Sequence, residues 1–224
     1  KNLSSINDID IDKIKNNANL IYSEAFNLDF QFKNIFIAAD LEAGEVNPQF
    51  VKTDINEIIL SVIDNFSHIS SKKEINIEYI PEKVCYFNTD SEKLYLIISN
   101  IISNALEFNS GNSKVVIAQK CGANSLNVTI TDSGIGIPKE LQQKIFDRFT
   151  QLETGTTKSH QGQGLGLSIT KALIDLLDAT IHIDSTPGKG TIISIEIPAP
   201  NISEVQNDFS DDGNEFFFDT DEKF

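Results

Sequence analysis

Apolar residues recur at alternating steps of four and three positions between residues 11 and 44. These positions are Ile14, Ala18, Ile21, Ala25, Leu28, Phe32, Ile35 and Ala39. This is the a/d spacing of a heptad repeat, and it predicts one helix with a single apolar seam. Ala43-Gly44, followed by Pro48, predicts the end of the helix. We expect the seam to pack in a bundle or coiled coil; the alternative is packing on the helix's own domain.

Between residues 48 and 200 the pattern alternates between helical and strand-like segments. Helices are expected at 55–66, from a capping box at 89–92 to about Phe108, after Pro138, and from near Leu165. Strands are expected at 75–81, 84–88, 114–120, 126–132, 180–184 and 191–197. Antiparallel strands with helices between them predict an α+β fold: a two-layer α/β sandwich with helices on one face, preceded by the long coiled-coil or bundle helix.

Charge divides the chain further and excludes some partners. The net charge of −15 over 224 residues argues against nucleic acid or an anionic membrane as the main partner. Residues 201–224 hold eight of the 33 acidic residues, one of the 18 basic residues and no periodicity, which predicts an acidic disordered tail or linker. The predicted units are therefore 1–47 (the long helix), 48–200 (the α+β domain) and 201–224 (the tail).

Cysteine usage and the chain's start complete the general picture. Cys85 and Cys121 lie far apart without metal-ligand spacing, which predicts free thiols in a reducing compartment. The sequence contains no run of about eighteen apolar residues, so it predicts no membrane-spanning helix. The chain starts at Lys1 and contains no Met, so we expect it to be part of a longer protein.

Two polar motifs suggest chemistry in the middle segment. Asn100 and Asn104 lie four apart and share one helix face. Their carboxamide oxygens suit Mg²⁺, which usually arrives with phosphates; the alternative is an ordinary helix surface. In the stretch 132–138, Asp132 precedes two glycines. Its carboxylate could accept a hydrogen bond from an exocyclic amine while the glycine backbone admits a flat ring; the alternative is a tight turn.

Two further motifs follow. Gly162, Gly164 and Gly166 occupy every second position, which fits neither the dinucleotide fingerprint nor the P-loop. Their backbone N–H groups and the start of the next helix suit an anion. The stretch IFDRF (145–149) contains Arg148, the only arginine.

In this order and at these spacings, the motifs resemble the ATP-binding catalytic domain of sensor histidine kinases, in the superfamily shared with gyrase, Hsp90 and the MutL mismatch-repair proteins. Asn100–Asn104 is similar to the N box, DSGIGIP (132–138) to the first glycine box and IFDRF to the F box. GQGLGL (162–167) is similar to the second glycine box and GKGT (188–191) to the last glycine turn. The resemblance covers about residues 10–198. The long helix resembles the second helix of the dimerisation and histidine-phosphotransfer hairpin.

The resemblance implies roles for the residues around the base and the metal. Asn104 would be the Mg²⁺ ligand, and Asn100 a phosphate or metal-shell partner with a catalytic role. Asp132 would bind the adenine amino group. The other residues of the ATP pocket around the base would be Gly134, Gly136 and Thr191.

The resemblance also implies a phosphate-binding group and a mobile lid. Gly162, Gly164, Leu165 and Gly166 would line the phosphates. Residues 150–161 would form the lid, in which Lys158 is a possible phosphate contact. Arg148 could reach the γ-phosphate or the phosphoacceptor; the alternative is a surface ion pair.

The implied function is a transferase of two-component signal transduction that uses ATP and Mg²⁺. Hydrolytic members of the superfamily place a Glu one turn before the metal Asn; Asn100 stands there and is no base, so we expect transfer to a protein group. None of the three histidines precedes an acidic residue, so the acceptor His is expected upstream of Lys1. Its phosphate would pass to a response-regulator Asp.

The resemblance implies a homodimer formed through the N-terminal helix. The location would be cytoplasmic, with a membrane reached only through upstream segments.

One departure from the family pattern is Glu107, where Lys or Arg is usual. A carboxylate near a triphosphate repels it. Two alternatives therefore stay open: a degenerate nucleotide-binding pseudokinase or scaffold, and an anti-sigma-type Ser/Thr kinase.

Overall fold

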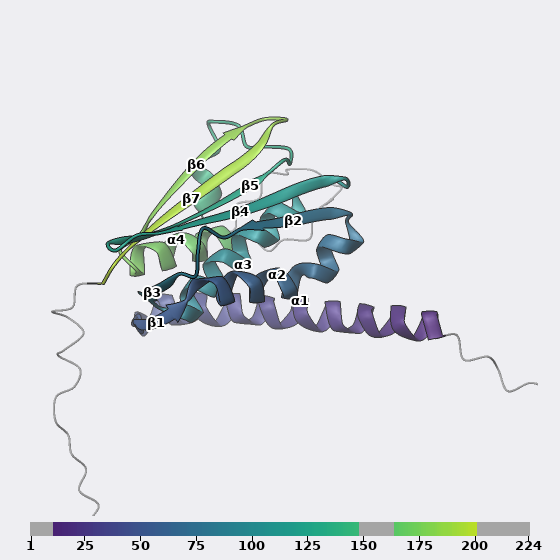
Figure 1. The fold of residues 1–224 in the computed structure, drawn as a ribbon, viewed down its shortest axis with the longest axis horizontal. Helices are drawn as coiled ribbons and strands as arrows, with labels where there is room; N and C mark the ends of the chain where they lie inside the picture. The colour runs from purple at the N-terminus through teal and green to yellow at the C-terminus, as the bar shows by residue number, and fades with distance from the viewer. Residues whose placement is uncertain (1–10, 148–163, 201–224) are drawn as a thin grey trace, which may run out of the picture.

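The computed structural model describes residues 11–147 and 164–200 (Figure 1). Its elements in chain order are α1 (Ile11–Ala43), β1 (Val51–Asp54), α2 (Ile55–Lys72), β2 (Ile75–Ile80), β3 (Tyr86–Thr89), α3 (Ser91–Glu107), β4 (Ser113–Cys121), β5 (Ser125–Asp132), the 3₁₀ turn η1 (Lys144–Phe146), α4 (Gly166–Leu176), β6 (Thr180–Thr186) and β7 (Gly190–Pro198). The expected tail, the whole of the expected lid and the site residues Arg148, Lys158 and Gly162 lie outside the described residues.

The main sheet has five strands in the order β2-β4-β5-β7-β6. Helices α2, α3 and α4 lie along one face of it (Figure 1). The predicted α+β sandwich behind a long helix is therefore confirmed. The expectation of purely antiparallel strands was wrong, because β2 pairs in parallel with β4. The connection between these two strands contains β3 and α3, and such a crossover permits parallel pairing. A separate two-stranded sheet joins β1, which was not predicted, to β3.

Alternation along the strands places aliphatic side chains against the helices. Val115 and Ile117 of β4 are fully buried, and so are Leu126 and Val128 of β5. Helix α3 is buried over most of its surface, because it lies between the sheet and the neighbouring helices. Each aliphatic side chain that is removed from water contributes about 1.5–3 kcal/mol. The same burial encloses the polar side chain of Asn100, which is only 2% exposed.

The start of α3 differs by one residue from the predicted capping box. The N-cap is Asp90, whose carboxylate accepts a hydrogen bond from Lys93 N at 3.0 Å. The other carboxylate oxygen accepts from Gln49 N at 2.8 Å. Asp90 therefore fixes the start of α3 and the segment before β1, whereas Thr89 belongs to β3.

Helix α1 has the predicted bounds, but it contacts the domain through a different stripe from the predicted seam. The stripe that is buried or half-buried comprises Ser23, Phe26, Phe30, Asn34, Ile37, Ala38 and Leu41. Phe26 and Phe30 both present edge-to-face contacts to Phe66 of α2, with centroids 5.1 and 5.7 Å away. The seam residues Ile14, Ile21, Leu28, Phe32 and Ile35 remain 43–70% exposed. Packing on the helix's own domain thus occurs, and the seam stays open on another side.

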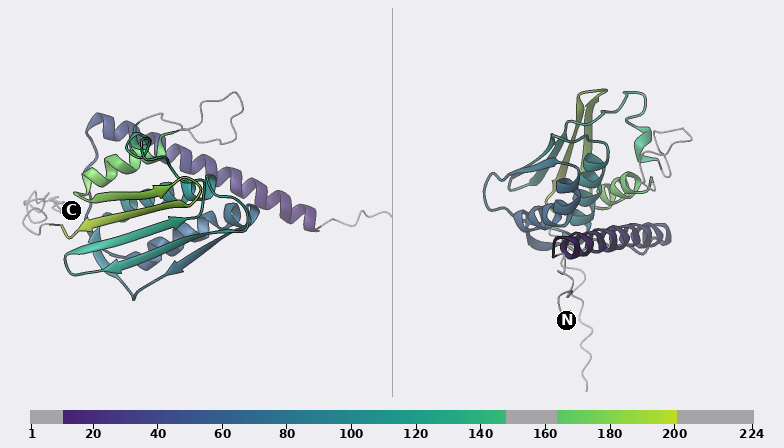
Figure 2. Two further views of the ribbon diagram at one scale, coloured as in Figure 1. Left: turned by 90° about the horizontal axis from the view of Figure 1, so that it is seen from above. Right: turned by 90° about the vertical axis from the view of Figure 1, so that its right-hand side faces the viewer.

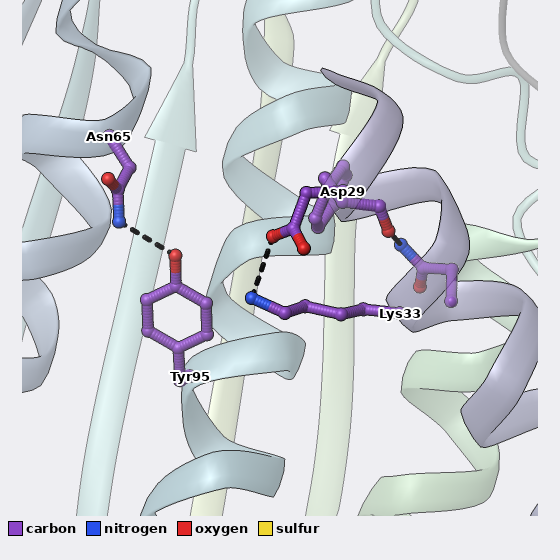
Figure 3. A network of polar contacts seen from close by, with 6 residues as sticks. Asp29, Lys33, Asn65 and Tyr95 are labelled. Carbon is purple, nitrogen blue, oxygen red and sulfur yellow. Dashed lines mark hydrogen bonds and ion pairs between the residues drawn. The ribbon is translucent and has the colours of Figure 1, made fainter. Parts of the chain in front are cut away.

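Polar contacts flank the helix interface (Figure 3). On α1, Lys33 Nζ lies 2.7 Å from Asp29 Oδ2, and this hydrogen bond raises the pKa of Lys33. Asn65 Nδ2 of α2 donates to Tyr95 Oη of α3 at 2.8 Å. Two further views show α1 running along the helical layer with its N-terminal end extending beyond the domain (Figure 2).

The predicted free thiols were wrong, because Cys85 and Cys121 form a disulfide with a Cα–Cα distance of 5.8 Å. Cys85 directly precedes β3 and Cys121 is the last residue of β4, so the fold brings together residues 36 apart in sequence. Asn56 supports the junction: its Oδ1 accepts hydrogen bonds from Cys85 N at 3.1 Å and Gln119 Nε2 at 2.8 Å. In the described part of the chain, every helix is too short or too polar to cross a membrane.

Candidate nucleotide-binding site

The end of β5 and the start of β7 bring two predicted site residues opposite each other. Asp132 pairs with Thr191 in the antiparallel register. Burial raises the pKa of Asp132 above its usual 3.8, and hydrogen bonds from the backbone N–H groups of Gly134 and Thr191 oppose that rise. The Gly134 N to Asp132 Oδ1 distance is 2.7 Å. Asp132 is thus a partly desolvated acceptor held in place by backbone donors.

Gly136 lets the loop after Asp132 press against the turn between β6 and β7. Its φ is +68°, and a Cβ at this position would collide with the carbonyl oxygen of Thr186. A residue with a side chain fits neither the backbone angle nor the space. Gly188 N donates to Ile135 O at 2.7 Å across the same junction. The first glycine box and the last glycine turn therefore form one structural unit.

Ser185 joins the same unit and was missed by sequence reasoning. Its Oγ accepts from Ile137 N at 2.8 Å and lies 2.9 Å from Thr191 Oγ1. It also donates to Gly190 O at 2.9 Å. Ser185 therefore orients the Thr191 hydroxyl. It belongs to no motif; the one available signal was its position opposite Thr191 in the predicted pair of strands.

The C-terminal turn of α3 closes one side of this unit. A Cβ on Gly134 would lie 2.5 Å from the carbonyl oxygen of Phe108, so only glycine permits the close approach. The Phe108 oxygen accepts from Ile135 N at 3.2 Å, and Phe108 N donates to Asn104 O at 3.0 Å. Asn104 is half-buried and lies one turn before this contact. The predicted metal ligand and adenine acceptor thus lie on adjoining elements.

The described part of the second glycine box lies beside Asn100. Helix α4 begins at Gly166, and Gly164 has a φ of +70°. A Cβ on Gly166 would lie 3.1 Å from Asn100 Oδ1. Leu165 is half-buried against the core. The start of α4 is therefore packed directly on the N-box helix.

Asn100 has a second neighbour that the sequence did not predict. Its Nδ2 donates to Asn34 Oδ1 of α1 at 2.9 Å, and both side chains are buried. Asn34 lies between Phe30 and Ile37 in the packed stripe, and a polar residue among these apolar ones was the available signal. The sequence pattern did not indicate Asn34, because the heptad seam predicted that another side of the helix is packed.

Together these residues offer the donors and acceptors that a magnesium-bound purine nucleotide needs. The half-buried carboxylate of Asp132 and the glycine backbone lie at one end, and the carboxamides of Asn104 and Asn100 with the glycine loop lie at the other. Among the described residues, no three His, Cys, Asp or Glu side chains cluster as a metal site. Carboxamide oxygens, together with phosphate and water oxygens, are ligands that suit Mg²⁺.

Comparison with known families decides the assignment. The family model described as "Histidine kinase-, DNA gyrase B-, and HSP90-like ATPase" matches residues 89–201. The chain belongs to this ATPase family. The match covers all five predicted boxes, from the asparagines of α3 to the last glycine turn.

Its relatives within the family are sensor histidine kinases. The sensor histidine kinase TmoS of Ectopseudomonas mendocina is 31% identical over 192 residues, which are 84% of this chain and 20% of TmoS. The sensor protein kinase WalK of Staphylococcus aureus is 32% identical over 167 residues, 74% of this chain and 40% of that sequence. The chain thus spans well under half the length of these curated relatives.

Solved structures confirm the fold. The catalytic domain of histidine kinase ThkA is 29% identical with a TM-score of 0.59, covering 68% of this chain and 99% of that domain. Full-length ShkA in complex with AMPPNP has a TM-score of 0.67 at 20% identity, covering 80% and 37%. ThkA in complex with the response regulator TrrA has a TM-score of 0.60 at 24% identity, covering 84% and 52%.

Proposed function

We propose that this histidine kinase-type ATPase chain binds Mg·ATP and transfers the γ-phosphate to a His on a dimerisation hairpin. The observation that carries the proposal is the convergence on α3: Gly134 approaches its C-terminal end, and Gly166 packs beside Asn100 one turn before Asn104. The proposed division is 1–47 for the hairpin helix, 48–200 for the catalytic domain and 201–224 for the tail.

Each described residue has a proposed task at the nucleotide. The Asp132 carboxylate accepts a hydrogen bond from the adenine amino group, and Gly134 and Gly136 keep the backbone close enough for the ring. Asn104 presents an oxygen to the metal, which would supply charge stabilisation for the transferred phosphoryl group. Gly164, Leu165 and Gly166 form the described wall of the phosphate site. Gly162, Lys158 and Arg148 are proposed to complete it.

Transfer to a protein group is favoured over hydrolysis by the chemistry of Asn100. A hydrolytic site needs a base near the metal Asn to activate water. Asn100 is neutral, and its amide is engaged with Asn34. With no carboxylate at that position, a bound water has no base there to take its proton, so the phosphate is kept for an incoming side chain.

The proposed next acceptor is an aspartate of a response regulator. The crystallised complex of ThkA with its response regulator TrrA supports this partner class for a protein of the same fold. We also propose a cytoplasmic location, because the proposed phosphotransfer uses ATP, with any membrane attachment made by upstream segments.

We also propose a homodimer formed through the exposed seam of α1, and the seam supplies a direct test. Ile21 is 70% exposed and Leu28 55% exposed, and burying each against a partner helix would contribute about 1.5–3 kcal/mol. Replacing both with glutamate is expected to convert a dimer into a monomer, measured by light scattering after gel filtration. Asn16→Glu, at an exposed position off the seam, is the matched control. Equal masses for all three proteins would contradict the proposed dimer.

Glu107 is expected to weaken nucleotide binding. It is the last residue of α3, and Lys73 Nζ donates to the backbone oxygens of Leu106 and Glu107 at 2.8 and 3.3 Å. Glu107→Lys replaces repulsion of the phosphates with attraction and should tighten Mg·ATP binding about tenfold. Calorimetry at low salt measures this. Glu196→Lys, an exposed position on β7, makes the same charge change elsewhere; equal effects of the two substitutions would refute a local role for Glu107.

A phosphotransfer assay tests the proposed function itself. The chain is joined to an upstream His-bearing hairpin and supplied with Mg·ATP labelled in the γ-phosphate. Acid-labile phosphate on His is the expected product. Acid-stable phosphoserine would instead support the anti-sigma-type Ser/Thr kinase, and nucleotide binding without transfer would support the pseudokinase or scaffold.

A further inference from the structure

A hydrogen-bonded relay runs from the backbone of α1 to Asn100 of α3, whose side chain lies beside the start of α4. Asn34 Nδ2 donates to Phe30 O at 3.0 Å within α1. Asn34 Oδ1 accepts from Asn100 Nδ2 of α3 at 2.9 Å. The oxygen of Asn100 then lies beside Gly166, where a Cβ would be 3.1 Å from it. Asn34 and Asn100 are 6% and 2% exposed, so neither amide is free to exchange its partners with water.

The chemistry of the relay fixes which way each amide points. A backbone carbonyl can only accept, so Asn34 must turn its NH₂ group toward Phe30. The side-chain oxygen of Asn34 therefore faces Asn100, which must donate to it from its own NH₂ group. The oxygen of Asn100 is consequently turned away from α1. A flipped amide would set two donors or two acceptors against each other in a buried place, which is costly.

We propose that Asn34 is a positioning residue for the nucleotide site. By engaging the NH₂ group of Asn100, it holds the Asn100 oxygen toward the glycine box, where magnesium and its phosphate ligands are proposed to bind. The inference rests on the proposed function, since it gives the Asn100 oxygen its task. It adds that a residue of the long helix, 66 positions away in sequence, sets the orientation of that oxygen.

A merely structural role for Asn34 makes a different prediction. If Asn34 only fixed the position of α1 on the domain, its loss would change stability and leave the metal dependence of binding as it is. A positioning role predicts a selective loss of metal-assisted binding, because the adenine contacts of Asp132 do not involve α1. The ratio of nucleotide affinities with and without magnesium therefore separates the two roles.

The test compares the full chain with Asn34→Leu and Asn34→Asp. Leucine removes the acceptor for Asn100, whereas aspartate, which burial keeps protonated, accepts from Asn100 and donates its O–H to Phe30 O. Binding of a non-hydrolysable ATP analogue is measured by calorimetry with magnesium and with excess EDTA, and thermal unfolding checks folding. Asn34→Leu is expected to lose about tenfold in affinity with magnesium, as for other residues that orient ligands, and nothing with EDTA. Asn34→Asp is expected to stay near wild type in both conditions.

Several results would overturn the inference. One is an affinity ratio for Asn34→Leu equal to that of wild type, and another is an equal loss with magnesium and EDTA. If Asn34→Leu does not fold, Asn34→Asp decides the test. Because this variant keeps the acceptor for Asn100, a tenfold loss of affinity confined to the magnesium condition would contradict the inference. In an Asn100→Leu background, Asn34→Leu should have no further effect on the ratio. Wild-type protein that binds the analogue equally with magnesium and EDTA would refute the proposed metal role instead.

Discussion

Replacing Asp132 with alanine is expected to weaken nucleotide binding about 100-fold. The carboxylate is the only charged acceptor proposed for adenine, and a hydrogen bond to a charged group contributes about 1.5–3 kcal/mol. Its position is fixed by Gly134 N at 2.7 Å, so no neighbouring group can replace it without moving the loop. Calorimetry with Mg·ATP measures the loss. Asp184→Ala, an exposed carboxylate on β6, should leave the affinity unchanged, and comparable losses in the two variants would contradict the assignment.

The same carboxylate predicts how binding depends on pH. Burial raises the pKa of Asp132 above 3.8, so in the folded protein it takes up a proton at a higher pH than an ordinary aspartate. At pH values above the folded-state pKa, ionised Asp132 lowers the free energy of unfolding. This cost disappears as the pH falls below the pKa of Asp132 in the unfolded chain. Nucleotide affinity changes with pH in the opposite direction from stability, because the protonated carboxyl group is a poorer hydrogen-bond acceptor. Affinity should therefore fall as the pH is lowered toward the raised pKa, while Asp132→Asn gives a flat profile.

Reducing the Cys85–Cys121 disulfide is expected to lower the free energy of unfolding by about 4 kcal/mol. The bond closes a loop between residues 36 apart, and the loop entropy removed from the unfolded chain gives that magnitude. It also ties the segment before β3, which Asn56 supports at the start of α2, to the end of β4. Denaturation with and without dithiothreitol measures the difference.

A double variant with serine at both cysteines is the control for the disulfide. It should unfold like the reduced protein, and dithiothreitol should not change its midpoint. Identical midpoints for oxidised and reduced wild-type protein would show that the bond does not stabilise the fold. The comparison also bears on the compartment, since a reducing cytoplasm would hold the chain in its less stable form.

Local patterns were sufficient to predict much of the fold. The heptad spacing predicted the α1 helix, Ala43-Gly44 predicted its end, and the alternation in 114–132 predicted the β4–β5 hairpin. The parallel pairing of β2 with β4 could not be predicted, because it depends on the path of the intervening α3 rather than on either strand's own residues. The disulfide was missed for the same reason, since the separation of the cysteines hides a contact that only the tertiary fold makes.

In the candidate site, too, some residues can be predicted from the local sequence and others only from their partners in the fold. Asp132, Gly134 and Gly136 carry a local signal, because a carboxylate followed by two glycines at the end of a predicted strand can be recognised from the sequence alone. Asn34 and Ser185 carry almost none: each is a small polar residue whose importance comes from the partner it meets, Asn100 or Thr191. The roles of all the site residues stay predictions, and Arg148, Lys158 and Gly162 also lie outside the described parts of the chain.

The two stripes of α1 have a mechanical consequence. One stripe holds Phe26, Phe30 and Asn34 against the domain, and the other leaves Ile21 and Leu28 exposed for the proposed partner helix. Because both belong to one continuous helix of 33 residues, the helix cannot turn about its axis at one surface and stay still at the other. A rotation applied at the N-terminal end would shift the aromatic contact at Phe66 and the amide of Asn100 together, so the helix would couple the proposed dimer seam to the proposed nucleotide site.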